Sequence, residues 1–296
     1  MTRDAVLRAA LDDGPALVAC KLLRRAGALV LMFALAGCAG TALSSKPGAF
    51  DAQRMRVEFR KRELPVTYVK PVVDRHPGYF VVFATGDGGW HGPSAALFSH
   101  LAEQGYVLAG LSSPEVLNRS QKPRRRFSPT QATANLANLF ASIRRTLGVD
   151  SPASMIVVGF SRGASIVAYT AMNPRLRVGL AGIVAIALTR EDEYVRAPTG
   201  RRRRDLKIND QGQLQIYPSL AAVSGTRLAV IQSTNDHYVR AAESRELLGP
   251  DTPERRLYAV ESRNHMFGGG RDVLMSDLDD ALRWIETKAQ PEAAAP

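Results

Sequence analysis

The sequence is poor in cysteine, in aromatic residues and in the histidine patterns of metal enzymes. Its two cysteines, Cys20 and Cys38, are too few for a disulfide scaffold or for a metal site built from cysteine alone. None of its five histidines belongs to an HExxH motif, which argues against a metalloprotease, and we expect neither a metal nor a cofactor. Of the 296 residues, 45% are hydrophobic and 23% are charged, a balance that predicts a folded globular chain.

Acidic residues are also scarce relative to basic ones. The chain has 39 Lys and Arg against 28 Asp and Glu, which gives a net charge of +11. Residues 1–37 hold five basic and three acidic residues, so residues 38–296 keep a net charge of +9. Such an excess favours an anionic partner, namely nucleic acid, a phospholipid surface or an acidic substrate.

The N-terminal segment has the pattern of an export signal. Lys21, Arg24 and Arg25 precede twelve uncharged residues, 26–37, as in a signal peptide. The sequence Leu-Ala-Gly-Cys at 35–38 resembles the bacterial lipobox, so we predict removal of 1–37 and lipidation of Cys38. The protein would then be exported and anchored in the periplasm, preferably to the outer membrane. The alternative is an uncleaved anchor over 26–43, but spanning helices need about 20 strongly apolar residues.

The remainder is predicted to alternate strands and helices. We expect a polar tether over 38–53, one domain over 54–289 and a disordered tail over 290–296. Apolar runs predict strands at 57–59, 66–69, 79–84, 107–111, 155–158, 182–188, 228–231 and 257–260. A capping box at Ser128 and Gln131 predicts a helix that ends before Gly148. A second helix, 271–288, carries one apolar face made of Val273, Leu274, Leu278, Leu282 and Ile285.

This alternation predicts the α/β class, with a mostly parallel central sheet and helices on both faces. A GxSxG motif at 159–163 lies between the strand at 155–158 and a helix of small residues. In that context a tight turn lifts the serine hydroxyl above the sheet, so Ser161 is the predicted nucleophile. An ordinary glycine-rich turn is the alternative.

A nucleophilic serine needs a base to take its proton and an acid to orient the base. In α/β-hydrolases with such an elbow, the chain order is Ser, then Asp or Glu, then His. Asp236 follows the strand at 228–231 and His265 follows the strand at 257–260, so both obey this order. Loop capping and a surface imidazole are their non-catalytic interpretations. Weaker candidates for these roles are His91, His100, His237 and Glu243.

The loop Gly86-Asp87-Gly88-Gly89-Trp90 follows the strand at 79–84. Acyl transfer requires N–H donors where the oxyanion forms. We predict the backbone N–H groups of Arg162 and Asp87 as these donors. Gly86 and Trp90 are predicted to contact the substrate, although a mobile glycine-rich turn is the alternative.

Together, this loop, the Gly-Phe-Ser-Arg-Gly elbow and the late Asp and His resemble the VirJ/AcvB group of bacterial virulence proteins within the α/β-hydrolase superfamily. The resemblance covers most of residues 78–287. It implies an exported or periplasmic serine hydrolase. Some relatives cleave the aminoacyl ester of aminoacylated phosphatidylglycerol, and others are described through type IV secretion. Many relatives carry Ser-Phe-Gly in the elbow, whereas this chain has Ser161-Arg162-Gly163.

Two basic clusters, Arg124 to Arg126 and Arg201 to Arg204, could bind phosphate groups, and Arg201 and Arg202 are predicted to contact the substrate. Solvated loops are the equal alternative. Nucleic acid is disfavoured because no aromatic residues interleave with the arginines. Three acids, Glu191, Asp192 and Glu193, either meet an ammonium group of the substrate or are solvated.

Two classes of function therefore remain. The first is an exported serine hydrolase that cleaves a carboxylic ester, with aminoacyl-phosphatidylglycerol as a candidate substrate. The second is a non-catalytic periplasmic binding or virulence accessory protein, linked to secretion, on the same fold. The intact order of nucleophile, acid and base favours the enzyme.

Overall fold

A computed structural model describes residues 50–289 except 61, 118–126, 150–153 and 197–206. The predicted signal peptide, the lipidation site Cys38 and the C-terminal tail lie outside the described residues. So do the two basic clusters at 124–126 and 201–204.

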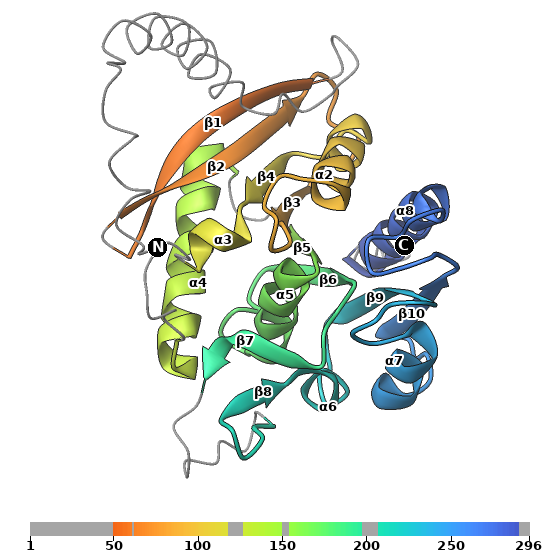
Figure 1. Cartoon of the computed structure of the whole chain (residues 1–296). Helices are drawn as coiled ribbons and strands as arrows, with labels where there is room; N and C mark the ends of the chain where they lie inside the picture. Colours follow the sequence, from red (N-terminus) through yellow and green to blue (C-terminus); the bar gives the residue numbers. More distant parts are fainter. Residues whose placement is uncertain (1–49, 61, 118–126, 150–153, 197–206, 290–296) are drawn as a thin grey trace, which may run out of the picture. The chain divides into compact units, whose positions relative to one another are not determined.

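An eight-stranded sheet lies at the centre, in the order β1-β2-β4-β3-β5-β6-β9-β10 (Figure 1). Its strands are β1 (Phe50–Phe59), β2 (Arg62–Pro71), β3 (Tyr79–Ala84), β4 (Leu108–Leu111), β5 (Ser154–Phe160), β6 (Leu180–Ile186), β9 (Arg227–Ser233) and β10 (Arg255–Val260). The hairpin β1–β2 is antiparallel and β2 is antiparallel to β4, whereas all other neighbours are parallel. The predicted mostly parallel sheet is confirmed.

Helices cover both faces of this sheet (Figure 1). On one face lie α2 (Pro93–Glu103) and α8 (Arg271–Ala289), and on the other lie α4 (Pro129–Leu147), α5 (Arg162–Met172) and α7 (Ala241–Leu248). Successive residues of a strand point to opposite faces, so Val82 packs into the core beneath α4 and α5 while Phe83 contacts Phe98 of α2. Because both faces are buried, the strands read as continuous apolar runs.

The two clearest helix predictions are largely confirmed. Ser128 and Gln131 form the predicted capping box, and Gly148 ends α4 in the left-handed conformation with φ of 58°. In α8, Leu274, Leu278, Leu282 and Ile285 are buried as predicted. Val273 was wrongly included in that face and is 49% exposed, because adjacent residues of a helix point about 100° apart.

The first two strands are longer than the sequence predicted. Strand β1 begins at Phe50, so the last four residues assigned to the tether belong to the hairpin, with Phe50 opposite Pro71. In this edge hairpin several polar side chains of β1 are exposed, which hides its strands from a search for apolar runs.

Between β6 and β9 the chain forms a small separate sheet. It consists of β7 (Glu191–Arg196) paired antiparallel with β8 (Gln213–Gln215), and the short helix α6 (Ile216–Leu220) follows it. Strand β7 packs on α5, the helix that starts after Ser161. The sequence did not predict these two strands.

Candidate active site

Ser161 lies on a strained turn between β5 and α5. Its φ of 53° and ψ of −115° fall in a region that residues other than glycine rarely adopt. The flanking glycines are required by close packing, since a Cβ on Gly159 would collide with the backbone of Gly163. A Cβ on Gly163 would in turn collide with the backbone of Ala84. The strand–turn–helix geometry of a nucleophile elbow is therefore present.

The structure brings Ser161, Asp236 and His265 together. His265 Nε2 lies 2.9 Å from Ser161 Oγ, and His265 Nδ1 lies 2.7 Å from Asp236 Oδ2. Asp236 follows β9 and His265 follows β10, two neighbouring parallel strands whose carboxyl ends meet at one edge of the sheet. Asp236 is only 2% exposed and His265 only 6%, so water has little access to their contact.

Gln232, a residue that the sequence did not indicate, holds the acid in place. It is fully buried near the end of β9, and its Nε2 lies 3.0 Å from Asp236 Oδ2. The same amide donates to the Val239 carbonyl at 2.6 Å, while its oxygen accepts the Leu188 N–H at 2.9 Å. The signal that could have found it is a glutamine directly after the apolar run 228–231.

The second carboxylate oxygen of Asp236, Oδ1, accepts the N–H of Tyr238 at 2.9 Å. The Tyr238 ring lies edge-on to the His265 ring, with centroids 4.9 Å apart, and is largely exposed. In the loop that carries His265, Asn264 Oδ1 accepts the N–H groups of Met266 and Gly268. The loop after β9 and the loop after β10 are thus each held by hydrogen bonds within the loop.

The loop after β3 brings Asp87 to the elbow. Gly86 N–H donates to Ser94 Oγ at 3.0 Å, and Gly89 N–H returns to the Gly86 carbonyl at 3.1 Å. The Asp87 carboxylate forms an ion pair with Arg162, whose Nη2 lies 2.9 Å from Oδ2 and whose Nε contacts Oδ1. Both predicted oxyanion donors therefore belong to residues beside Ser161.

Gly86 and Trp90, which were predicted to contact the substrate, are not among the described residues that line the pocket beside Ser161. Gly86 is buried against the elbow, since a Cβ there would come within 3.0 Å of the Phe160 ring and 3.3 Å of Ser161 Cβ. The Trp90 ring packs edge-on against Phe98 with centroids 4.9 Å apart, and it occupies the space that a side chain at Gly110 would need. The half-buried Trp90 ring is therefore held by Phe83 and Phe98.

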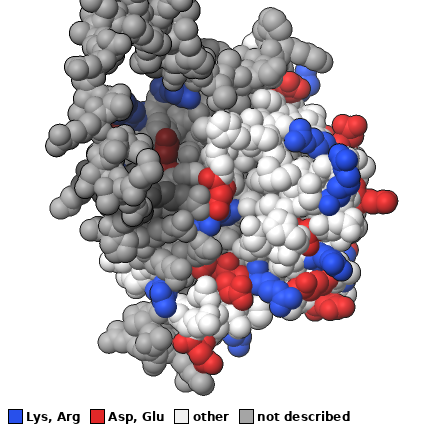
Figure 2. Space-filling view, viewed as in Figure 1, with Lys and Arg blue, Asp and Glu red and all other residues white. Residues whose placement is uncertain are grey.

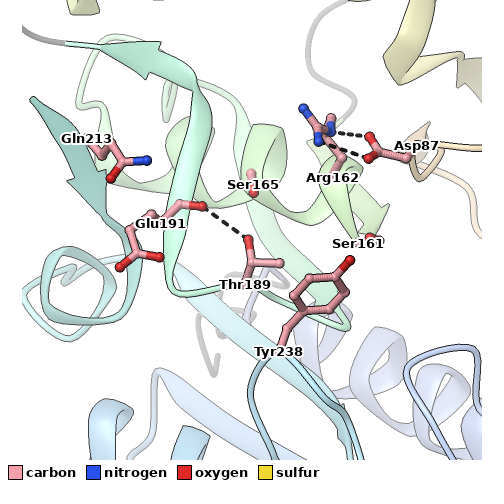
Figure 3. A pocket seen from close by; sticks show the side chains of 8 residues that line it. All are labelled: Asp87, Ser161, Arg162, Ser165, Thr189, Glu191, Gln213 and Tyr238. Atoms are coloured by element: carbon pink, nitrogen blue, oxygen red, sulfur yellow. Dashed lines mark hydrogen bonds and ion pairs between the residues drawn. The ribbon is translucent and has the colours of Figure 1, made fainter. Parts of the chain in front are cut away.

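A polar pocket of about 190 Å³ opens beside Ser161 (Figure 3). The described residues that line it are Asp87, Ser161, Arg162, Ser165, Thr189, Glu191, Gln213 and Tyr238. In Figure 3 the Asp87–Arg162 pair lies on one side of the pocket, and Glu191 and Gln213 of the small β7–β8 sheet lie on the other. Polar side chains dominate, which favours a polar group of the substrate near Ser161 over a long aliphatic chain.

The three acids at 191–193 separate in the structure. Glu191 lines the pocket, whereas Asp192 is buried, and its Oδ1 accepts the N–H of Tyr194 at 2.6 Å. The prediction that Asp192 meets substrate or solvent is therefore wrong, because successive residues of β7 point to opposite sides. The side chain of Glu193 lies outside the described part.

Two competing candidates for the catalytic base and acid have other partners. His100 Nε2 lies 2.8 Å from Asp279 Oδ1, a contact that joins α2 to α8. Glu243, at the start of α7, forms an ion pair with Arg190. Both side chains are therefore engaged in contacts other than with Ser161.

Charge on the described surface is mixed. On the face in Figure 2, basic and acidic side chains of the described residues alternate over short distances. Within residues 50–289 and outside their gaps, no group of three His, Cys, Asp or Glu side chains is arranged to hold a metal ion. None of the described helices is both long and apolar enough to cross a membrane.

The family described as bacterial virulence protein (VirJ) matches residues 78–250, more than half of the chain. The protein belongs to this VirJ family. The matched range of this VirJ-family chain includes Asp87, Ser161 and Asp236 and ends before His265. No curated protein matches its sequence.

Three solved structures with a similar fold are described as hydrolases. An α/β serine hydrolase without lid from Xanthomonas campestris has a TM-score of 0.52 and 15% identity, covering 81% of this chain and 96% of its own. The esterase domain of a Rhodothermus marinus protein has a TM-score of 0.52 and 13% identity, with 80% and 98% covered. An acylaminoacyl peptidase from Pyrococcus horikoshii has a TM-score of 0.57 and 14% identity, over 84% of this chain but only 43% of its own. The VirJ-family chain therefore has the α/β-hydrolase fold.

Proposed function

We propose that this VirJ-family protein is a serine hydrolase that cleaves carboxylic esters with Ser161, His265 and Asp236. The observation that carries the proposal is the line of short contacts from Ser161 Oγ through His265 to Asp236, at 2.9 Å and 2.7 Å. Both lengths are those of hydrogen bonds, and they fall on an elbow with the backbone strain of a nucleophilic serine.

In the proposed first step, His265 Nε2 takes the hydroxyl proton of Ser161 while Oγ bonds to the ester carbonyl carbon. The carbonyl electron pair moves to oxygen, and the backbone N–H groups of Arg162 and Asp87 stabilise that oxyanion. When the intermediate collapses, the carbon–oxygen bond to the alcohol breaks, and His265 returns the proton to the alcohol. Water then attacks acyl-Ser161 in the same way. Asp236 stays ionised and holds the imidazole in the required tautomer.

For the substrate we propose an aminoacylated anionic phospholipid. The pocket's described charges support an ammonium group on the acyl side, because Arg162 is already paired with Asp87 and Glu191 faces the same space. Such a lipid also carries a phosphate, for which the arginines at 124–126 and 201–204 are the proposed partners. The net charge of +9 beyond residue 37 would draw the domain to an anionic bilayer.

The decisive test of the enzyme proposal is labelling of Ser161. A fluorophosphonate probe should label the wild-type protein, and Ser161→Ala should abolish labelling and ester hydrolysis while thermal melting stays unchanged. Ser276→Ala, a change to an exposed serine of α8, is the matched control and should keep both signals. Wild-type protein that is neither labelled nor active would favour the accessory-protein function instead.

The substrate and the anchor need separate tests. Purified protein should release free amino acid from liposomes that contain lysyl-phosphatidylglycerol, and lipid left intact would remove this substrate.

We also propose that Cys38 carries a lipid. Cys38→Ser should then release the protein from the membrane fraction, and an intact N-terminus in mass spectra of the native protein would refute the anchor.

A further inference from the structure

The two residues that supply the proposed oxyanion donors are also joined through their side chains. Arg162 Nη2 lies 2.9 Å from Asp87 Oδ2, and Arg162 Nε contacts Oδ1, so both carboxylate oxygens are engaged (Figure 3). One hydrogen bond and one close ion-pair contact therefore hold the carboxylate against the guanidinium at two points. The link connects the start of α5 with the loop after β3.

The two ends of this link differ in rigidity. Arg162 begins α5, whose next residue Gly163 packs against the backbone of Ala84, so that end is fixed by the core. Asp87 lies at an exposed part of its loop between Gly86 and Gly88, and glycine neighbours give a peptide wide conformational freedom. The hydrogen bond from Gly86 N–H to Ser94 Oγ anchors the loop on one side of Asp87.

We propose that the Arg162–Asp87 ion pair is a positioning device for the oxyanion hole. Because α5 is fixed by the core, the ion pair holds the Asp87 peptide in place and so sets the distance between the N–H groups of Asp87 and Arg162. This inference rests on the proposed serine hydrolase function. Arg162 thereby acts on the reaction in two ways: its backbone N–H donates to the oxyanion, and its side chain positions the second donor.

The test measures whether the two side chains act as one unit. We would compare Asp87→Asn, Arg162→Gln and the double variant with wild type on p-nitrophenyl butyrate, an uncharged ester. One oxyanion donor contributes about 10²–10³ in kcat. Since the substitutions leave both N–H groups in place but loosen one of them, each single variant should lose about 10- to 100-fold in kcat with little change in KM. The double variant should be no worse than the poorer single variant.

A trifluoromethyl ketone forms an oxyanion on Ser161 and therefore tests the oxyanion hole directly. A loss of stability alone would not change its inhibition constant. Its inhibition constant should rise in each variant by about the factor by which kcat/KM falls. The control is Arg190→Gln, which breaks the Arg190–Glu243 ion pair outside the pocket and should leave kcat and the inhibition constant unchanged.

Three results would overturn the positioning device. They are single variants with wild-type kcat, losses that multiply in the double variant, or a raised KM at unchanged kcat. The last result would mean that Arg162 binds the substrate. These results require a wild-type protein that is labelled by fluorophosphonate and hydrolyses the ester. A wild-type protein that fails both would remove the proposed hydrolase, and the positioning device with it.

Discussion

The two halves of the candidate site are built in contrasting ways. The acid–base half, Asp236 and His265, is almost completely buried and is held by the amide of buried Gln232. The oxyanion half is open, since the Asp87 side chain is 45% exposed, and it is held by the ion pair with Arg162. One half is ordered by the core, and the other by a charge contact at the pocket wall.

The contrast follows from what each half has to do. A buried carboxylate is tolerated only where hydrogen bonds compensate for lost water, and such bonds hold the neighbouring imidazole in one tautomer. In the proposed reaction the oxyanion half meets the substrate, so it cannot be sealed. We therefore expect loss of the Asp236 carboxylate to cost more activity than loss of the Arg162–Asp87 ion pair.

The largest effect is expected from Asp236→Asn. The amide keeps the size of the side chain but no longer favours the tautomer with a proton on His265 Nδ1, so kcat should fall by about 10⁴-fold. The measurement is kcat on p-nitrophenyl butyrate, with circular dichroism to show that the fold is kept. Glu243→Gln changes another carboxylate of the chain, one paired with Arg190, and should retain activity. Equal losses in the two variants would contradict the assignment of Asp236.

Gln232→Met should affect two properties of the protein, its stability and its activity. The change removes the donor to Asp236 Oδ2 and leaves the buried N–H of Leu188 without its acceptor, which should lower the free energy of unfolding by about 1–3 kcal/mol. Activity should fall by about 10-fold, because the carboxylate gains freedom. Denaturant titration and steady-state kinetics measure the two losses.

A second variant adds a charge at the same position. Gln232→Glu keeps an acceptor for Leu188 N–H but places a second carboxyl group beside Asp236 in the core. Activity should therefore fall at least as far as in Gln232→Met, and the free energy of unfolding should also fall at least as far, because two buried carboxyl groups disfavour each other's ionised form. Wild-type activity in both variants would show that Gln232 supports only the core.

The same contrast explains which parts of the site the sequence could predict. Ser161, Asp236 and His265 were predictable because a local turn motif and the order of strands along the chain place them. Gln232 was not, because its role arises only where the ends of β6 and β9 meet the loop at Val239. A glutamine directly after an apolar run marks the position but does not reveal its three partners.

The wrong predictions about side chains of the site concern segments whose backbone conformation was not predicted. Glu191 and Asp192 point to opposite sides of β7, but β7 was not predicted, so both acids were treated alike. Trp90 was assigned to the substrate because it ends a glycine-rich loop, whereas its ring is held by Phe98. The mostly parallel sheet was predictable because strands buried on both faces form unbroken apolar runs.

Glu191 tests the open half from the side opposite to Asp87. If its carboxylate meets an ammonium group of the substrate, Glu191→Gln should raise KM for a lysine ester by about 3- to 10-fold, in line with an exposed charge contact. KM for p-nitrophenyl butyrate should not change. Glu246→Gln, an acid of α7 that does not line the pocket, serves as the control. An equal rise for charged and uncharged esters would argue against ammonium recognition.

The smallest expected effect is the dependence of kcat on salt, which should come from the open half and not from the buried half. Exposed ion pairs contribute about 0.2–1 kcal/mol and weaken as ions screen them, whereas buried hydrogen bonds respond little. Raising the NaCl concentration should therefore lower wild-type kcat on p-nitrophenyl butyrate by about 2-fold, through the Arg162–Asp87 pair. The uncharged ester removes any effect of salt on substrate attraction. The Asp87→Asn/Arg162→Gln variant has no pair left to screen, so its lower kcat should not depend on salt, whereas Arg190→Gln should keep the wild-type response. The same salt response in the wild type and the double variant would show that the Arg162–Asp87 pair is not the source of the salt dependence. The open half would then respond to salt no more than the buried half does.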